Sequence, residues 1–545
     1  MSRRTHFLPI LVVLSFSLGS VYAQNFTVGD RTTQVTNTNI NPGGLAAGST
    51  VSFQGNIVVS GLGPAGAAVF IDPVPSGLSL TFQAGSTVTS VMEVGVYIDD
   101  PFDGSFNNLG SISAFSDGVG FNDVFSGTFS NSGTITSTIF DGVFFDDDMD
   151  GVFTNTGTII GGQDGVDIDG DLNGTFINRG TIMGLESGEE GVEVEGILAG
   201  TFINYGTIHG ADDGLDIQTR VTGSILNYGT ISGEDDGIDI DGNLGVNARL
   251  FNYGTIEGEF AGVDIDRNLN GIITNYGSIS GRVEDGISIA RDVEVNGAIN
   301  NYGSIQGGDF GIHIDRNLIG SIFNCGVIEG SLAGIRSFNT TGTIRNHGGR
   351  IQGGNNAIRL GMGDGTVILS GPSHIVGGIG GGGGNDTIRF ENMRGITDAK
   401  KAELAAIDAA NPATSSVVLF GEIIEWQNIE EIEADTASMS SYSSLITGAG
   451  LQNYATALDN IQGLDDDFRS FLKALNDVDA ALLNDIANNS SGRNVLNAFN
   501  DFARRQDTRI YSLFADHFST LRGGVSGRPG PVAGVQQTGL FSREV

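Results

Sequence analysis

The sequence is short of the residues that cross-link an exported chain or draw it to an anionic partner. Of its 545 residues one is cysteine, and lysine occurs at three positions. Because Cys325 has no second cysteine to pair with, no intrachain disulfide can form, and stability must come from packing or bound ions. The net charge of −37 repels phosphate backbones and anionic lipids, so we expect no nucleic-acid partner.

Long apolar runs are equally scarce. The run from Leu8 to Leu18 is too short to cross a bilayer as a stable anchor. It follows Arg3 and Arg4 and precedes small residues at 21–23, which is the pattern of a Sec-type signal peptide over residues 1–23. We therefore expect an exported chain with no transmembrane anchor.

What the sequence does contain is a repeat. An apolar residue, any residue, Asn, any residue and Gly occur in that order eleven times, at intervals of 22 to 26 residues. The asparagines are Asn108, Asn131, Asn155, Asn178, Asn204, Asn227, Asn252, Asn275, Asn301, Asn324 and Asn346. A period in this range is typical of a chain built by stacking one supersecondary unit.

The segment 224–250 shows the pattern within one repeat. Asn227 and Gly229 lie on one face of an extended chain, and further along Ile238 and Ile240 share a face while acidic residues share the other. This gives three short strands per repeat and no helical pattern. We predict an all-β fold, a right-handed parallel β-helix (solenoid) of about 11–13 coils, followed by a C-terminal α-helical linker.

The recurrent asparagine is expected to face inward. Its amide can hydrogen-bond to the asparagine of the next coil and satisfy buried polar groups at a bend. Asparagine and the glycine two residues later also tolerate left-handed backbone angles. The motif is therefore interpreted as structural.

Between the asparagines lies an acidic phrase such as Asp236-Gly237-Ile238-Asp239-Ile240-Asp241. Stacking predicts one outward row of Asp167, Glu193, Asp216, Asp239 and Asp264, and a second row of Asp169, Glu195, Asp241 and Asp266. Like charges ~5 Å apart repel by about 0.8 kcal/mol per pair in water. Bound Ca²⁺ would relieve this repulsion. The alternative is a solvated acidic face that keeps the rod soluble.

One glycine-rich turn adds a further candidate ligand. The stretch 381–389 contains Asp386 and matches the Ca²⁺-binding nonapeptide pattern of the repeats-in-toxin proteins. A single copy is also what the last glycine-rich turn of a β-helix would show. Asp386 joins the acids of the two rows as a candidate calcium ligand, and no other cofactor is expected.

A row of aromatic residues follows five consecutive motif asparagines. Its members are Tyr205, Tyr228, Tyr253, Tyr276 and Tyr302, which we call the Tyr strip. Aromatic faces pack well on carbohydrate rings, so the strip could bind sugar. Stacked rings would also simply stabilise adjacent coils.

We do not expect an enzyme or catalytic residues. A catalytic set normally interrupts a repeat, whereas these acids follow it. His313 replaces the row acid between two isoleucines and lies beside Asp315, a pairing that is more often accidental than catalytic.

The segment after the repeats is predicted to close the rod. Residues 397–411 form a short helical pattern, and strand-like runs follow at 417–420, 423–424 and 426–432. The expected organisation is a signal peptide (1–23), N-terminal coils or cap (24–107), the repeat β-helix (108–392), closing strands with a helical insertion (393–437), an α-helical linker (438–522) and a flexible tail (523–545).

This order resembles a type V autotransporter passenger. The likeness rests on the signal peptide, the Asn-x-Gly-x-Ile repeat, the turn at 383–388, the segment 422–432, and the helical stretches 454–459 and 480–483. The resemblance implies a surface-exposed, periplasmic or extracellular β-helix of a Gram-negative-type bacterium, linked to the outer membrane. No barrel segments follow the helical run, so we expect a truncated gene, a separate outer-membrane barrel or another export route.

The expected function is that of an adhesin or surface-interaction rod. Its partner would be a carbohydrate or a host or neighbouring cell-surface ligand. Two alternatives remain open, a polysaccharide lyase or hydrolase on the same fold and a structural component of an envelope or matrix.

Overall fold

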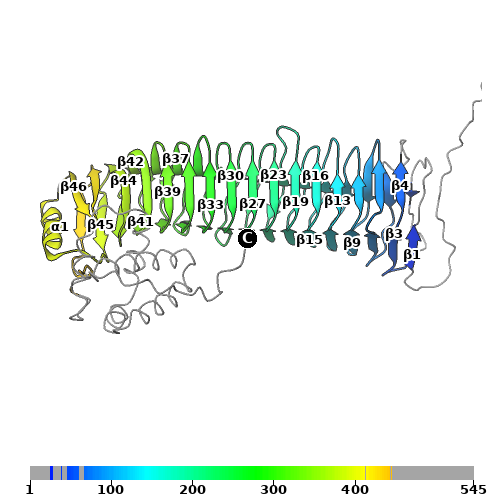
Figure 1. The fold of residues 1–545 in the computed structure, drawn as a ribbon, viewed down its shortest axis with the longest axis horizontal. Helices are drawn as coiled ribbons and strands as arrows, with labels where there is room; N and C mark the ends of the chain where they lie inside the picture. Colours follow the sequence, from blue (N-terminus) through cyan, green and yellow to red (C-terminus); the bar gives the residue numbers. More distant parts are fainter. Residues whose placement is uncertain are drawn as a thin grey trace, which may run out of the picture.

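The computed structural model describes residues 25–28, 38–39, 46–59, 67–411, 413–441 and 444. The expected signal peptide and tail, and nearly all of the expected helical linker, lie outside them. The described chain is a parallel β-solenoid of about 14 coils, stacked in one row in Figure 1. The predicted β-helix is confirmed, with slightly more coils than the eleven motifs suggested. Coils without the motif flank the array, because Phe82 and Leu369 occupy the asparagine position there.

Each central coil contributes one strand to each of three faces. In the coil that carries Asn227 these are β26 (Ser224–Asn227), β27 (Thr230–Gly233) and β28 (Ile238–Ile240). We call them the first, second and third face. Every strand pairs in parallel with its equivalent in the next coil, so equivalent residues align in rows along the axis.

The remaining strands repeat this arrangement. On the first face lie β1 (Asn25–Val28), β3 (Thr50–Phe53), β6 (Ser79–Phe82), β9 (Ser105–Asn108), β12 (Thr128–Asn131), β15 (Val152–Asn155), β18 (Thr175–Asn178), β22 (Thr201–Asn204), β29 (Arg249–Asn252), β32 (Ile272–Asn275), β35 (Ala298–Asn301), β38 (Ser321–Asn324), β41 (Thr343–His347), β43 (Thr366–Ser370), β45 (Thr387–Glu391) and β48 (Glu431–Ala434). On the second face lie β4 (Asn56–Val59), β7 (Thr87–Ser90), β10 (Ser111–Ser113), β13 (Thr134–Thr136), β16 (Thr158–Gly161), β19 (Thr181–Gly184), β23 (Thr207–Gly210), β30 (Thr255–Gly258), β33 (Ser278–Gly281), β36 (Ser304–Gly307) and β39 (Val327–Gly330). On the third face lie β2 (Thr38–Asn39), β5 (Ala67–Ile71), β8 (Val94–Ile98), β11 (Val119–Phe121), β14 (Val143–Phe145), β17 (Val166–Ile168), β20 (Val192–Val194), β24 (Leu215–Ile217), β31 (Val263–Ile265), β34 (Asp285–Ile289), β37 (Phe310–Leu318) and β40 (Ala333–Thr340). Two long strands, β42 (Arg350–Met362) and β44 (His374–Gly383), run across the second and third faces, and β21 (Ile197–Leu198) pairs with β25 (Arg220–Val221) at a corner.

The motif asparagines form the predicted inward ladder. All eleven are fully buried. Nδ2 of Asn204 donates to Oδ1 of Asn227 at 2.9 Å and to the carbonyl of Thr230 at 2.9 Å. Its own Oδ1 accepts from the backbone N–H of Gly206 at 3.1 Å. Each amide is therefore satisfied by the coil stack itself.

The tolerance for left-handed angles is not used by the motif asparagines or by ten of the eleven motif glycines. Only the last motif glycine, Gly348, has a positive φ. The glycine is required instead by close approach between coils. A Cβ on Gly229 would lie 2.0 Å from the carbonyl oxygen of Gly206, closer than any side-chain carbon can come.

The core is one continuous column of apolar side chains. Phenylalanines stack along the first face from Phe106 through Phe129 and Phe153 to Phe202, with ring centroids 4.3 to 5.0 Å apart. From Ile225 onward aliphatic residues take over the same row. Apart from the asparagine ladder, this inward row thus stays apolar from coil to coil.

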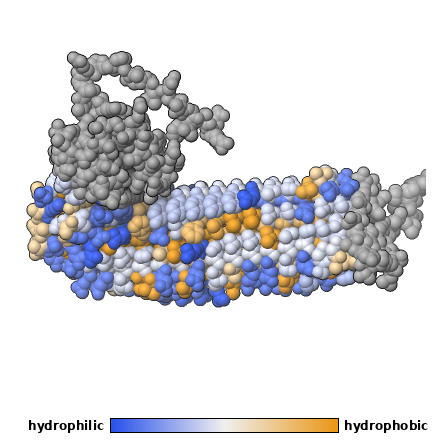
Figure 2. All heavy atoms as spheres, turned by 90° about the horizontal axis from the view of Figure 1, so that it is seen from below, coloured by the Kyte–Doolittle hydropathy of each residue, from blue (hydrophilic) through white to orange (hydrophobic). Residues whose placement is uncertain are grey.

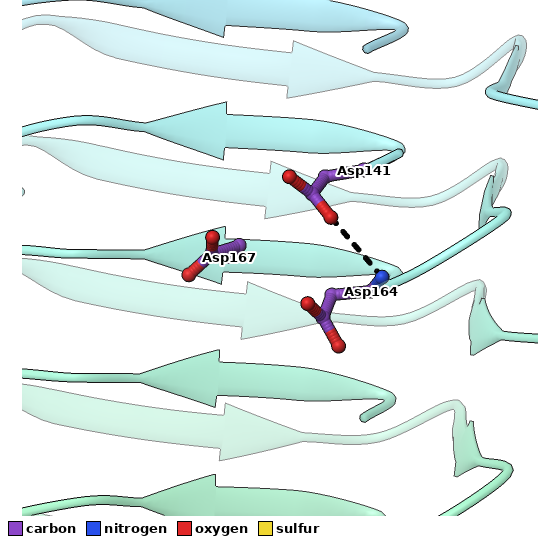
Figure 3. Close-up of side chains that lie close together, drawn as sticks. All are labelled: Asp141, Asp164 and Asp167. Carbon is purple, nitrogen blue, oxygen red and sulfur yellow. Dashed lines mark hydrogen bonds between the residues drawn. The ribbon is translucent and has the colours of Figure 1, made fainter. Parts of the chain in front are cut away.

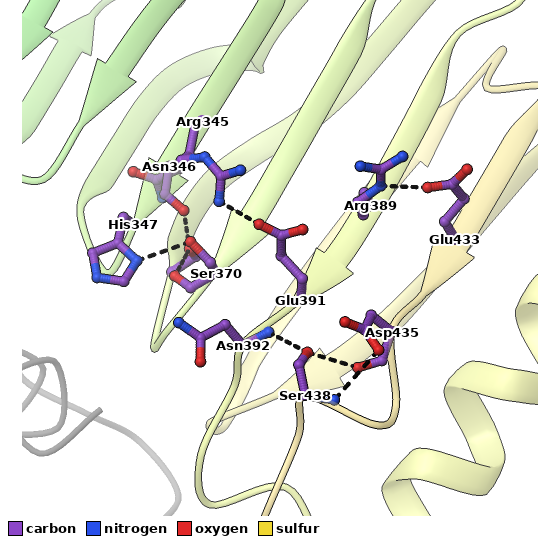
Figure 4. A network of polar contacts seen from close by, with 11 residues as sticks. Arg345, Asn346, His347, Ser370, Arg389, Glu391, Asn392, Glu433, Asp435 and Ser438 are labelled. Atoms are coloured by element: carbon purple, nitrogen blue, oxygen red, sulfur yellow. Dashed lines mark hydrogen bonds and ion pairs between the residues drawn. The ribbon is translucent and has the colours of Figure 1, made fainter. Parts of the chain in front are cut away.

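One end of the rod is closed as predicted. Helix α1 (Asp398–Ala410) matches the helix expected at 397–411, and β46 (Thr414–Leu419) pairs antiparallel with β47 (Glu422–Gln427). Figure 4 shows the polar network beside it, in which Arg345 pairs with Glu391 and Arg389 pairs with Glu433. Two glutamates at this end, Glu391 and Glu433, therefore have cationic partners.

The outer surface is banded. In Figure 2, residues of similar hydropathy form bands along the rod axis, because equivalent outward positions stack from coil to coil. Among the described helices none is long and apolar enough to cross a membrane.

Candidate functional site

Acidic residues gather where the chain turns from the second face into the third. One set directly precedes a glycine at this turn: Asp141, Asp164, Glu190, Asp213 and Asp236. The other set lies on the third-face strands: Asp167, Glu193, Asp216, Asp239 and Asp264. We call these the turn acids and the strand acids, and together the acid column.

The two sets meet in groups of three carboxylates. In the group of Asp141, Asp164 and Asp167, one oxygen of each lies within 4.8 Å of the others. Figure 3 shows that these side chains come from two successive coils. Similar groups follow along the rod: Asp164 with Glu190 and Glu193, Glu190 with Asp212 and Asp213, Asp213 with Asp216 and Asp239, and Asp236 with Asp239 and Asp264.

The turn acids are held in place by the backbone of the next coil. Oδ1 of Asp141 accepts the N–H of Asp164 at 3.1 Å, and Oδ1 of Asp164 accepts the N–H of Glu190 at 2.6 Å. The same bond joins Asp213 to Asp236 at 2.7 Å. One oxygen of each of these three aspartates is thereby fixed, which fixes the direction of its carboxylate.

The strand acids are less well satisfied. Oδ1 of Asp167, Asp216 and Asp239 is buried without a hydrogen-bond partner. Asp167 is only 8% exposed, so at this position the row is not the solvated face that stood as the alternative to bound Ca²⁺. Stacking at the strand spacing explains this burial, because each carboxylate is covered by its equivalents in neighbouring coils.

Burial and mutual repulsion raise the pKa of these carboxyls. Burial, and then the charges of Asp141 and Glu193, raise the pKa of Asp167 to about 10. Burial followed by the charges of Asp239 and Glu193 raises the pKa of Asp216 to about 8. Burial is also the main cause that raises the pKa of Asp164, which shares its site with Glu190. The ionised column is thus strongly disfavoured unless something compensates the charge.

Among the described residues, cationic side chains approach this row where the acids end. The strand-acid row continues from Asp264 through Ser288 to His313 and Arg336. Nδ1 of His313 lies 2.8 Å from Oδ2 of Asp285, the acid at the next turn, and Arg336 contacts the other ring nitrogen. Within the described ranges no ion pair joins a member of the acid column to an Arg or Lys.

The structure thus groups five of the ten metal candidates derived from the sequence. The strand acids Asp167, Glu193, Asp216, Asp239 and Asp264 all belong to three-carboxylate groups, whereas none of the groups in the described residues includes Asp169, Glu195, Asp241 or Asp266. The turn acids were missed as ligands. Their signal was the acid–glycine pair that opens each acidic phrase.

Asp386 lies near the closing end of the rod and contacts Gly365 and Glu430 there. It is fully buried, its Oδ1 accepts the N–H of Gly365 at 2.8 Å, and Glu430 accepts its backbone N–H at 3.0 Å. Burial raises its pKa to about 6. Its Oδ2 is buried without a partner, but it lies in none of the carboxylate groups.

The Tyr strip forms a continuous stack on the outside of the rod. Neighbouring rings from Tyr205 to Tyr302 are 4.9 Å apart and nearly parallel. Arg179 covers the free face of Tyr205 at 4.2 Å, and Phe323 packs against Tyr302. The rings are 42% to 47% exposed. Because their faces are covered, a ligand can contact the edges and hydroxyls but cannot stack on the faces.

The rod therefore presents two chemically distinct arrays, clustered carboxylates and aligned phenol groups. No protein-family model matches the sequence, and comparisons with curated proteins and with solved structures found no match. The fold is the one that the autotransporter-passenger resemblance implies, and the role of the chain must be argued from these arrays.

Proposed function

We propose that this chain is an exported, non-enzymatic surface-interaction rod of the adhesin type. The observation that carries the proposal is the Tyr strip, whose five half-exposed rings stand in register at 4.9 Å intervals. Identical groups repeated along a rigid rod suit a ligand that also repeats, because many weak contacts then add. A carbohydrate chain or a glycan-bearing cell surface is such a ligand.

The distribution of unusual side chains supports a binding role. The strip and the acid column both follow the repeat coil by coil, and neither is a single interruption of it. Catalysis needs one site with distinct roles for its groups. Uniform rows offer many equivalent contacts instead.

Export to a surface supports the proposal as well. The signal peptide expected at residues 1–23 and the closed β-helix are features shared with the passengers that the sequence resembles. Adhesion itself is inferred by analogy with that family. A separate outer-membrane barrel is the partner that such an arrangement would need.

The test compares cell and glycan binding by the full chain with that of a hydroxyl-deficient variant. Y228F/Y253F/Y276F keeps the stacked rings and removes three phenol hydroxyls. If the hydroxyls contact the ligand, apparent affinity should fall by about tenfold or more while the melting temperature stays unchanged. Y97F is the matched control, because its hydroxyl bonds to Asn122 away from the strip. Equal binding by the triple variant and wild type would refute a role for the strip.

A second candidate is a polysaccharide lyase or hydrolase, favoured by the surroundings of His313. Its two ring nitrogens lie 2.8 Å from Asp285 and 3.1 Å from Asp315, and Arg336 is adjacent. A histidine oriented by carboxylates can act as a general base. Depolymerisation of acidic or neutral polysaccharides by the full chain, lost in H313A, would establish this activity in place of the binding role.

A further inference from the structure

The acid column combines buried negative charge with missing partners. Like charges in this environment interact more strongly than in water, and an unpaired buried carboxylate is costly. The closing end of the same rod shows the usual solution, since Arg345 and Arg389 each pair with a glutamate there. The column must be neutralised in another way.

Asp167 shows where a neutralising group would sit. It is more than nine-tenths buried, and its Oδ1 has no hydrogen-bond partner. One of its carboxylate oxygens lies within 4.8 Å of an oxygen of Asp141 and of Asp164 (Figure 3). Both turn acids are fixed by backbone N–H groups, so two of the three carboxylates are held in position before any ligand arrives.

The ligand type favours a hard cation. Groups made only of carboxylate oxygens favour Ca²⁺ or Mg²⁺ over Zn²⁺ or Cu²⁺. Mg²⁺ demands near-octahedral geometry at bond lengths of about 2.0 to 2.1 Å, whereas Ca²⁺ binds oxygens at about 2.3 to 2.6 Å in a flexible geometry. Three carboxylates that come from two coils, with one oxygen of each within 4.8 Å of the others, form the kind of irregular oxygen set that the flexible geometry of Ca²⁺ accommodates.

We propose that the acid column is a calcium-binding array in which Asp141, Asp164 and Asp167 form the first site. Each ion bridges turn acids and strand acids of successive coils. The groups around Asp239 repeat the arrangement, with Oδ1 of Asp216 and Oδ1 of Asp239 again buried and unpartnered. Because adjacent groups share members such as Asp164 and Asp239, occupancy of one group affects the next. Calcium thus acts as an axial clamp between coils.

This site is independent of the proposed surface function. The acid column lies at the turn into the third face, whereas the Tyr strip follows the first-face strands. Loss of calcium binding would leave the test of the Tyr strip intact, and the converse also holds.

The experiment titrates CaCl₂ and MgCl₂ into EDTA-treated full chain by calorimetry and follows thermal melting in parallel. The expected result is saturable Ca²⁺ binding at or below millimolar concentration and a higher melting temperature in Ca²⁺ than in Mg²⁺ or in NaCl of equal ionic strength. An equal effect of all three salts would show charge screening and overturn the proposal. So would the absence of Ca²⁺ heat at millimolar concentration, which would mean that protons neutralise the column.

Two substitutions locate the ions. D167N removes one ionisable carboxyl from the first site, and E195Q removes one from the neighbouring second row outside all groups. D167N should melt higher than wild type in EDTA, because an amide can be buried without the cost of neutralising a carboxylate, yet its melting temperature should rise less on addition of Ca²⁺. The melting temperature of E195Q should rise as much on addition of Ca²⁺ as that of wild type. Asp239 belongs to two groups and Asp167 to one, so Ca²⁺ should raise the melting temperature of D239N less than that of D167N. Equal gains in D167N, D239N and E195Q would contradict the assignment.

Discussion

Nδ2 of Asn227 donates a 2.9 Å hydrogen bond to Oδ1 of Asn252, its equivalent in the next coil. The bond links two side chains that are both fully buried and 25 residues apart in sequence. The same bond repeats from coil to coil, so the asparagine amides form a continuous hydrogen-bonded row inside an apolar core. The ladder stabilises the rod because it pairs buried polar groups. Removal of one amide takes a hydrogen bond from each of its two neighbours.

Asn227→Ala is therefore expected to lower the free energy of unfolding by about 1–3 kcal/mol. The buried amides of Asn204 and Asn252 each lose a partner. Thermal and urea denaturation followed by circular dichroism would measure the loss. Asn247→Ala, at an exposed position, is the control and should unfold like wild type. An unchanged stability of the Asn227 variant would contradict the ladder.

Gly229→Ala is expected to destabilise the rod, by about 1–3 kcal/mol as an overpacked site. The added Cβ would meet the carbonyl oxygen of Gly206 at 2.0 Å, so the coils must separate locally. Gly383→Ala is the matched control, since no atom lies within 4 Å of its added Cβ. Denaturation midpoints of the two variants should differ clearly. Similar midpoints would mean that neighbouring coils can move apart at the motif with little loss of stability.

Tyr253→Ala is expected to cost about 0.5–1.5 kcal/mol beyond the loss of buried area, because its ring stacks on two neighbours at 4.9 Å. Tyr253→Phe keeps both stacking contacts and should melt like wild type. If the alanine variant were as stable as the phenylalanine variant, the strip would have no structural role. The measurement separates packing from any ligand contact by the hydroxyls.

Without divalent cations, stability should fall as the pH rises from about 5 to about 8. The pKa values of Asp216 and Asp213 are raised to about 8, mainly by burial, whereas unfolded carboxyls titrate near pH 4. Between these values the folded chain binds more protons than the unfolded chain. The free energy of unfolding therefore falls as the pH rises towards the pKa of the folded carboxyls. The charges with the largest effect come from other members of the column, and the charged groups outside it that also raise these pKa values are further acids, Asp117, Glu189, Asp212, Asp235, Asp241 and Asp266.

Melting temperatures in EDTA across this range would measure the effect. D239N should flatten the profile, because one titrating group is removed. A melting temperature that rises with pH in EDTA would show that the column is compensated by a group other than protons.

The repeat made much of the fold predictable. The spacing of the motif asparagines fixed which residues would stack, and Asn204, Asn227 and Asn252 align as expected. The alternation around Ile238 and Ile240 correctly assigned inward and outward positions. The helix at α1 also followed from its local pattern.

The site was only partly predictable, for two physical reasons. Alternation within a strand says which face a side chain occupies, but it does not describe the bend before the strand that brings Asp164 beside Asp167. It also cannot report burial by neighbouring coils, which covers Asp167, Asp164 and Asp213. Likewise, the close approach at Gly229 depends on the distance between coils, which a linear sequence does not contain.

The most direct test of the calcium array is the calcium content of the full chain, measured by inductively coupled plasma mass spectrometry after dialysis against millimolar CaCl₂ and brief gel filtration. We expect more than one Ca²⁺ per chain in wild type, the same content in E195Q and a lower content in D239N. Calcium at buffer background in the wild-type chain, or equal content in all three, would contradict the account.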